Sequence, residues 1–220
     1  MNRYKYRICF EKDGLMRFIG HLDLLRLFQR TIKRAGLPVA YSAGYNPHQL
    51  VSFAMPLPIG HSSAAEYADV GLTQPHNCIA PLLSAQLPDG LQIVSVRQLR
   101  ESERSAAAQT AAAMYEIEFP EGLNLGKPVS EIMSAKSIII EKKTKSGAGA
   151  ADIRPDIINL YARGNILHAM LASGSARNLK PELLVKHIYG DTEYNPFKIK
   201  YRRIEIFQCT ASGYEPLSKP

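Results

Sequence analysis

The sequence has few cysteines and no long apolar run, and these absences exclude several classes of protein. The three cysteines among 220 residues, Cys9, Cys78 and Cys209, lie far apart, and none belongs to a Cys-x-x-Cys pair. A disulfide framework, a zinc ribbon and a cysteine-held iron–sulfur cluster are therefore not expected. We expect reduced, buried thiols instead.

Targeting signals and common catalytic motifs are also missing. No run of about 18 apolar residues occurs, so we expect no membrane span. The N-terminus, Met1–Arg7, does not resemble a secretory signal, which leaves the cytoplasm as the expected location. No Gly-x-Ser-x-Gly elbow and no Walker-type loop is present, and the glycines at 147 and 149 are typical of a linker.

The charge that is present is basic and unevenly placed. The net charge is +7, and residues 1–100 hold 11 Lys and Arg against 6 Asp and Glu, a surplus of five. Residues 101–220 hold 16 against 14, a surplus of two. An acidic partner such as RNA, DNA or an anionic protein surface is therefore expected, and the N-terminal half is expected to face it.

The order of the expected elements predicts two similar halves. Both halves read β-α-β-β-α-β, which predicts an α+β protein of two tandem ferredoxin-like domains with antiparallel sheets. The first covers residues 1–100 and the second 114–207. The Ala-rich segment 101–113 is interpreted as a connecting helix or linker, and 208–220 as a loose tail.

Periodicity and turn residues place the individual elements. Strands are predicted at 4–10, 15–19, 37–41, 50–54, 66–72, 91–96, 114–119, 137–141, 167–172 and 197–207. Helices are predicted at 21–35, 77–87, 129–135 and 180–188. Residues 142–151 are predicted to form a flexible loop.

The helix predicted over 21–35 has an apolar face and a basic face. At 100° per residue the apolar residues Leu24, Phe28 and Ile32 share one side. The basic residues of the other side are Arg26, Arg30, Lys33 and Arg34. This stripe is either a solvated helix face or a surface that follows the phosphates of a nucleic acid.

The polar residues between 17 and 66 are the candidate site residues. His21 begins the basic helix and His48 follows Asn46-Pro47 in a shaped loop, so both are candidates for acid–base catalysis. Each can equally be a packed or solvent-exposed histidine. The candidate substrate-binding residues are Arg17, Asp23, Arg26, Arg30, Lys33, Arg34, Tyr45, Asn46 and Glu66. No metal or other cofactor is expected, since no spacing matches a zinc motif.

Aromatic residues on the predicted strands offer a second route to RNA. Tyr4, Tyr6, Phe10 and Tyr201 lie among Lys and Arg, as in proteins that stack single-stranded bases on aromatic rings. The first three share one strand parity, so they can equally form the core face of the strand.

Several motifs carry a family resemblance. Gly20–Asp23, Arg34–Pro38, Gly44–His48 and Ser52–Gly60, with Glu66 following, resemble the radical-SAM-linked domain of unknown function. In the second half, residues 152–155 and 179–182 are similar to that domain as well. The resemblance implies a radical SAM protein as partner and implies no activity for the domain itself. The tandem arrangement also resembles CRISPR repeat-RNA endoribonucleases, although fold alone does not fix function.

Three functions remain open from the sequence. The preferred one is a non-catalytic accessory module that works with a radical SAM enzyme and binds a substrate, with RNA as the candidate, through the basic helix. The second is an RNA-processing or RNA-modifying enzyme that uses His21 and His48, which requires both imidazoles and a carboxylate in one cleft. The third is a protein–protein adaptor without nucleic acid, which requires an exposed apolar patch.

Overall fold

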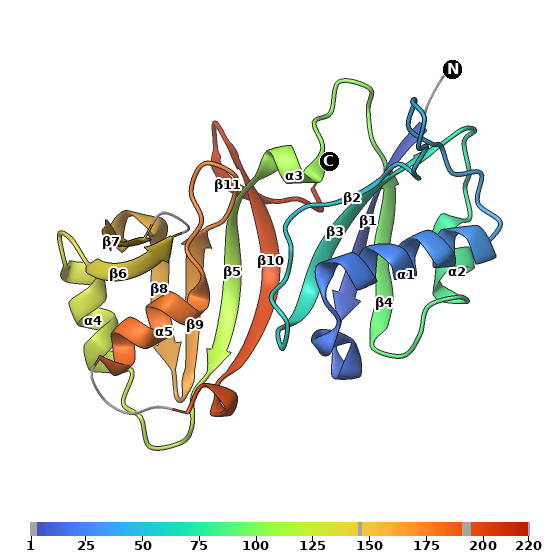
Figure 1. Ribbon diagram of the computed structural model, residues 1–220. Coiled ribbons are helices and arrows are strands. Elements are labelled where there is room, and N and C mark those ends of the chain that lie inside the picture. The colour runs from blue at the N-terminus through green and yellow to red at the C-terminus, as the bar shows by residue number, and fades with distance from the viewer. Residues whose placement is uncertain (1–3, 145–146, 191–194, 220) are drawn as a thin grey trace. The chain divides into compact units, whose positions relative to one another are not determined.

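The chain forms two units, each containing α-helices and an antiparallel sheet (Figure 1). The computed structural model describes residues 4–144, 147–190 and 195–219. Unit 1 consists of Met1–Thr110 and Glu205–Pro220, and unit 2 of Ala111–Ile204. The mixed α+β class with mostly antiparallel pairing confirms the coarse prediction. No helix among the described residues is long and apolar enough to cross a membrane.

Unit 1 is built on strands that pair in the order β4-β1-β3, with β2 also paired to β3. Its elements, in chain order, are β1 (Tyr4–Lys12), η1 (Gly14–Phe18), α1 (His21–Arg34), β2 (Val51–Phe53), β3 (Ser62–Leu72), α2 (Ile79–Ser84), β4 (Leu91–Gln98), α3 (Ala106–Gln109) and β11 (Gly213–Pro216). The chain order β-α-β-β-α-β predicted for residues 1–100 is thus present, but the strand predicted at 37–41 is wrong, since only isolated bridges form there, at Val39 and Tyr41.

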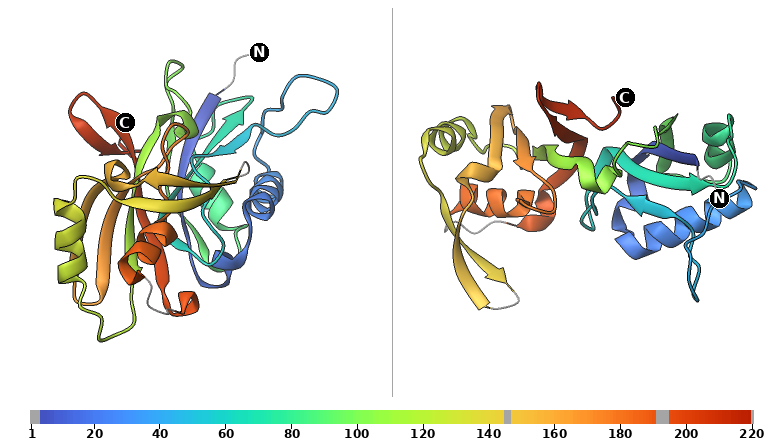
Figure 2. Two further views of the ribbon diagram at one scale, coloured as in Figure 1. Left: turned by 60° about the vertical axis from the view of Figure 1, so that its left-hand side comes forward. Right: turned by 90° about the horizontal axis from the view of Figure 1, so that it is seen from above.

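Local sequence explains both ends of α1. Gly20 is the N-cap, and Asp23 in the first turn interacts favourably with the positive end of the helix dipole. At the other end Gly36 has φ of +67°, a left-handed conformation that glycine adopts without a Cβ penalty. The predicted helix over 21–35 is therefore confirmed to within one residue. Figure 2 shows α1 lying against the strands of unit 1.

The segment predicted as a strand at 15–19 is instead the 3-10 helix η1. The side chain of Asp13 accepts a hydrogen bond from the backbone N–H of Gly14 at 2.7 Å, and Gly14 has φ of +56°. This side-chain cap ends the extended conformation, since Asp and Gly together favour a tight turn. The strand prediction was wrong because the apolar residues of η1 do not enter the core: none of them is buried.

Unit 2 has strands in the order β10-β5-β9-β8 and a separate two-stranded sheet, β6-β7. Its elements are β5 (Thr110–Glu118), α4 (Gly126–Ser134), β6 (Ile139–Thr144), β7 (Gly147–Asp152), η2 (Arg154–Asp156), β8 (Ile157–Arg163), β9 (Ile166–Ala172), α5 (Pro181–Tyr189), η3 (Pro196–Lys198) and β10 (Lys200–Thr210). The part of β10 up to Ile204 belongs to unit 2 and the remainder to unit 1.

The sequence placed the second strand of unit 2 wrongly. Residues predicted as a strand and a flexible loop, 137–141 and 142–151, form the β6–β7 hairpin outside the main sheet, and 145–146 lie outside the described residues. The strand β9 pairs with β5 on one side and with β8 on the other, and β8 was not predicted. A register shift between Ile157 and Asn159 interrupts the alternation of apolar and polar residues in β8, so the period-two signal is lost.

The C-terminal segment is part of the unit 1 core, and the predicted loose tail was therefore wrong. The strand β11 pairs with β10, and Leu217 is fully buried against Cys9, Tyr67 and Ile206. The helix in the predicted connector at 101–113 is also shorter than expected. It contains the four-residue α3, and β5 already begins at Thr110.

Replacing Leu217 by Ala tests the packed C-terminus. We expect the free energy of unfolding to fall by about 2–5 kcal/mol, because the substitution leaves a cavity in a closed cluster. Urea unfolding followed by circular dichroism measures the change. The matched control is Leu15→Ala, since Leu15 is 79% exposed and its truncation is expected to cost no more than about 0.5 kcal/mol. Equal, small effects of the two substitutions would contradict a packed C-terminus.

Candidate functional site

The orientation of α1 is fixed by aromatic packing on the strands. Phe28 lies 4.7 Å from Phe10 and 5.3 Å from Phe53 between ring centroids. Leu24 and Ile32 are buried on the same side of the helix. Because residues four apart share a helix face, this packing directs Arg26 and the basic residues that follow it toward solvent.

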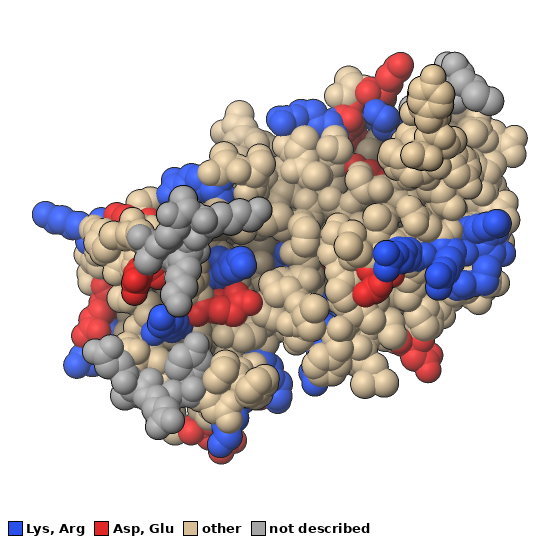
Figure 3. All heavy atoms as spheres, in the orientation of Figure 1, with Lys and Arg blue, Asp and Glu red and all other residues tan. Residues whose placement is uncertain are grey.

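The basic face of α1 borders a groove, which we call the α1 groove. It lies between α1 and residues 85–88, has a volume of about 600 Å³, and is lined on the helix side by Arg26, Arg30 and Arg34. The Arg34 guanidinium donates a hydrogen bond of 2.8 Å to the carbonyl of Gln86, which ties the two sides together. Lys33, also on this stripe, does not line the groove. Figure 3 shows Lys and Arg side chains gathered over α1.

The α1 groove carries a surplus of positive charge. Asp23 is its one acidic lining residue within the described chain, and it pairs with Arg26 at 3.1 Å. Both side chains of this pair are about two-thirds exposed, at 64% and 66%, so the pair is weak and exchanges readily with an incoming anion. Arg30 makes no ion pair with any described residue. Three arginines against one aspartate are therefore available to an anionic ligand.

His21 and Arg17 lie at the N-terminal end of α1. The His21 ring packs edge-on against Phe53, with centroids 5.6 Å apart. The Arg17 carbonyl accepts a hydrogen bond of 2.8 Å from the N–H of Gly60, and its guanidinium lies 4.7 Å from the Phe18 ring. The apolar residues around this turn are exposed rather than buried: Leu15, Phe18, Leu22 and Ile59.

His48 closes a projecting loop. Its Nδ1 is 2.9 Å from the hydroxyl of Ser42, and that hydroxyl also accepts a hydrogen bond from the His48 backbone N–H. Tyr45 and Asn46 at the tip are exposed, and Figure 2 shows the loop extending away from the strands. The side chain of Gln49 donates to the carbonyl of Gln29, which anchors the end of the loop on the middle of α1.

The two candidate catalytic histidines have different neighbours. His21 is the first residue of α1, whereas the His48 loop is attached at Gln29, eight residues and about 12 Å further along the helix. Across the described ranges, no group of three or more His, Cys, Asp and Glu residues is arranged to hold a metal ion. The contacts place His21 against Phe53 and His48 against Ser42, and a shared role in catalysis stays a prediction.

Glu66 is a buried residue of β3 rather than a surface contact. It is 3% exposed and stands opposite Phe10 in the β1–β3 register. Lys12 on the neighbouring strand is 1% exposed, and its ammonium donates to the carbonyl of Ile19 at 3.1 Å. Its role in substrate binding stays a prediction.

The aromatic residues considered for base stacking belong mainly to the core. Tyr6, Phe10 and Tyr201 are no more than 9% exposed, and Phe10 is fully buried. Their parity along the strands therefore marks the core face, and the stacking alternative is wrong for these three. Tyr4 is partly buried and packs against the same unit 1 cluster as Tyr6.

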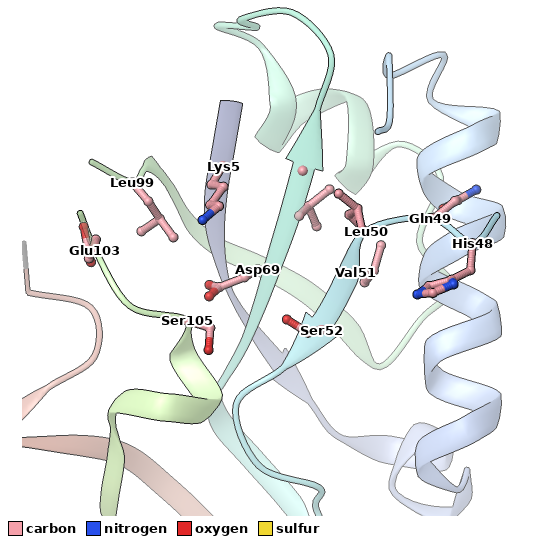
Figure 4. A pocket seen from close by; sticks show the side chains of 12 residues that line it. Lys5, His48, Gln49, Leu50, Val51, Ser52, Asp69, Leu99, Glu103 and Ser105 are labelled. Atoms are coloured by element: carbon pink, nitrogen blue, oxygen red, sulfur yellow. The ribbon is translucent and has the colours of Figure 1, made fainter. Parts of the chain in front are cut away.

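A second hollow, which we call the β2–β3 pocket, was not predicted from the sequence. It has a volume of about 320 Å³ and lies between β2, β3 and residues 99–105 (Figure 4). Lys5, Ser52 and Asp69 line it together with apolar side chains, and His48 lies at one side, next to α1. These residues are distant in sequence and carry no motif, so only the strand pairing brings them together.

An ion-pair network fixes one wall of this pocket. Arg7 is 2% exposed and donates from Nε to Asp69 at 2.8 Å, from Nη1 to Gln109 at 2.6 Å and from Nη2 to the Arg104 carbonyl at 3.0 Å. Asp69 also accepts a hydrogen bond of 2.7 Å from the N–H of Ala106 at the start of α3. The network thus docks residues 104–109 on the sheet.

Glu103 extends this network toward β4. Both of its carboxylate oxygens accept hydrogen bonds from the Arg97 guanidinium. These bonds hold the pKa of Glu103 below its ordinary value. The carboxylate therefore stays ionised at neutral pH and is already neutralised by arginine.

The candidate motif at 152–155 in unit 2 has a structural role. Asp152 accepts hydrogen bonds from the backbone N–H groups of Ile138 and Arg154, which lower its pKa. Arg154 donates to the carbonyls of Met133, Ala135 and Ile157. These contacts satisfy carbonyl groups at the C-terminal end of α4 and hold the β6–β7 hairpin at its base.

Breaking the Arg7–Asp69 pair is expected to destabilise unit 1 strongly. Asp69→Ala removes the closest carboxylate from a buried guanidinium and leaves only the longer Glu103 contact of 3.7 Å, so we expect a loss of about 3–5 kcal/mol of unfolding free energy in urea titrations. Asp89→Ala, at an exposed turn, is the matched control and is expected to change little. A loss below about 1 kcal/mol for Asp69→Ala would show that the network does not hold residues 104–109 in place.

Comparisons with known proteins give a family and no activity. Residues 5–181 match the family described as "Uncharacterized protein conserved in bacteria (DUF2344)", and this description mentions neither radical SAM chemistry nor RNA. Among curated proteins none matches. A crystal structure of an unknown protein from Galdieria sulphuraria is similar at 12% identity over 92% of this chain and 98% of that one, with a TM-score of 0.29. Since the family match spans most of its length, this chain belongs to the DUF2344 family of uncharacterized bacterial proteins.

Proposed function

We propose that this protein is a non-catalytic module that binds single-stranded RNA in the α1 groove and acts with a partner enzyme. The observation that carries the proposal is the alignment of Arg26, Arg30 and Arg34 along one groove that contains a single acidic residue. The partner implied by the family resemblance is a radical SAM enzyme. The excess of basic residues in the first hundred residues supports an anionic ligand on unit 1.

The spacing of the arginines suits a chain of phosphates. Residues at i, i+4 and i+8 of an α-helix are separated by a rise of about 6 Å per step and lie on one face. A flexible polyanion can therefore contact each guanidinium in turn. Arginine forms bidentate hydrogen bonds with phosphate, and the release of counterions from the nucleic acid favours binding. A positively charged groove that follows the backbone is typical of proteins that bind single strands.

An adaptor role is the second candidate, and one observation favours it. Four large apolar side chains are exposed around the turn between η1 and α1: Leu15 at 79%, Phe18 at 53%, Leu22 at 63% and Ile59 at 67%. Exposed apolar residues that lie together mark surfaces for protein contact. This surface borders the α1 groove, so one module can hold RNA and a partner protein through neighbouring parts of unit 1.

We also propose that both units are ferredoxin-like. The strand orders β4-β1-β3-β2 and β10-β5-β9-β8 correspond when β6–β7 is treated as an inserted hairpin. Each then has the form β-α-β-β-α-β with antiparallel neighbours. This proposal refines the α+β class and does not determine the function.

Charge reversal in the α1 groove tests RNA binding. We expect Arg26→Glu, Arg30→Glu and Arg34→Glu together to abolish binding of a single-stranded RNA oligonucleotide in fluorescence anisotropy at low salt. For Ala substitutions at these three positions, the slope of log K against log salt is expected to fall by about two, since each lost phosphate contact contributes about 0.7.

The matched control reverses three exposed lysines on the helices of unit 2 and the segment after α4, namely Lys127, Lys136 and Lys186. It changes the net charge by the same amount and is expected to leave most of the affinity intact. If both triple variants lose RNA equally, binding depends on net charge and the α1 groove is not the site.

Removing both imidazoles tests the enzyme alternative. His21→Ala with His48→Ala is expected to leave RNA affinity within about twofold of wild type, because neither residue lines the α1 groove. It is also expected to leave the RNA intact, as judged by gel analysis of labelled RNA incubated with each protein. Cleavage or modification of RNA by wild type that disappears in the double variant would establish catalysis and overturn the proposal.

A further inference from the structure

The β2–β3 pocket is separate from the α1 groove, since the two share no lining residue. Successive residues of β3 point to opposite faces of the sheet. Ala68 and Val70 join the clusters that pack under α1, so Asp69 faces the other way. A ligand of this pocket would therefore not compete with RNA for the arginines of α1.

The shape and lining of the pocket suit a small organic molecule. Its volume of about 320 Å³ falls at the lower end of the range for small-molecule sites, about 300–1,000 Å³. Most of the wall is apolar. Leu50 and Leu99 lie on the Asp69 face of the sheet, and Val51 and Val70, which pack with the clusters under α1, also line the pocket. At Gly71 an added Cβ would lie 3.2 Å from the Cβ of Leu50. Glycine at this position therefore allows the Leu50 side chain to pack closely against β3.

The charges at the pocket leave one cation available. Asp69 is paired with Arg7 and also accepts the N–H of Ala106, and Glu103 is paired with Arg97. The Lys5 ammonium, by contrast, forms no hydrogen bond or ion pair with a described residue, and Figure 4 shows Lys5 beside Asp69 at the pocket. Both carboxylates are neutralised by arginines, so the charge that remains for a ligand is the positive charge of Lys5.

We propose that the β2–β3 pocket binds a small apolar molecule that carries one carboxylate. The apolar body occupies the space between Leu50 and Leu99, and the carboxylate pairs with the Lys5 ammonium. The hydroxyl of Ser52, which has no partner among the described residues, points into the same space and donates a second hydrogen bond (Figure 4). A polyphosphate is disfavoured, because a single lysine faces a largely apolar wall.

Two fluorescent probes that differ by one anionic group test the charge. Anilinonaphthalene sulfonate carries a sulfonate in place of the carboxylate, and phenylnaphthylamine has the same rings without it. We expect Lys5→Met to lower the affinity for the sulfonate probe about tenfold, as for loss of one charge-assisted hydrogen bond. The affinity for the uncharged probe is expected to stay unchanged. Lys136→Met is the control and is expected to affect neither probe.

A pocket-filling variant tests the location. Ser52→Trp is expected to abolish binding of both probes, whereas Ser95→Trp, at an exposed position of β4, is expected to preserve it. Octanoate should displace the sulfonate probe from wild type, and octanol should do so much less effectively. Circular dichroism checks that each variant is folded, and if Ser52→Trp does not fold, the Lys5→Met result decides.

The proposal is overturned if the sulfonate probe does not bind wild type, if Lys5→Met leaves its affinity unchanged, or if folded Ser52→Trp binds it as tightly as Ser95→Trp. It is also overturned if octanol displaces the probe as well as octanoate does. The variant with glutamate at positions 26, 30 and 34 is expected to retain probe binding. Failure of the pocket proposal can therefore be distinguished from failure of the proposed RNA site.

Discussion

The packing of Phe28 between Phe10 and Phe53 is the contact on which the α1 groove depends. The three rings join α1 to β1 and β2, with centroid distances of 4.7 to 5.9 Å. Loss of one such ring from a core costs about 3–5 kcal/mol, a large part of the stability of a domain. Because the apolar face of α1 packs on the strands, its basic face points toward solvent and borders the groove.

A second constraint acts on the other face of the same sheet. Arg7 is buried there, and a buried guanidinium is stable only when its donors are satisfied. Asp69, Gln109 and the carbonyl of Arg104 satisfy them, and in doing so they place residues 99–105 beside β2 and β3. The β2–β3 pocket is a consequence of this arrangement. One unit thus offers a cationic groove on one face and a mostly apolar pocket on the other.

Local patterns were sufficient for α1 and for the strands β1, β2, β3 and β4 of unit 1, but not for features that depend on distant partners. The spacing of Leu24, Phe28 and Ile32 identified the buried side of α1 and hence its basic side. The bulge in β8 removed the alternation that would have identified it, and the burial of Leu217 depends on β11 pairing with β10. The β2–β3 pocket could not be predicted from the sequence, because strand pairing brings together residues that are distant in the chain.

Chemical protection of individual arginines by bound RNA tests the central claim most directly. Phenylglyoxal modifies accessible guanidinium groups, and mass spectrometry of peptides reports each site with and without saturating RNA. The account predicts that RNA slows modification of Arg26 and Arg30 strongly while exposed Arg163 and Arg177 of unit 2 react at unchanged rates. Unchanged modification of Arg26 and Arg30 in the presence of bound RNA would contradict it.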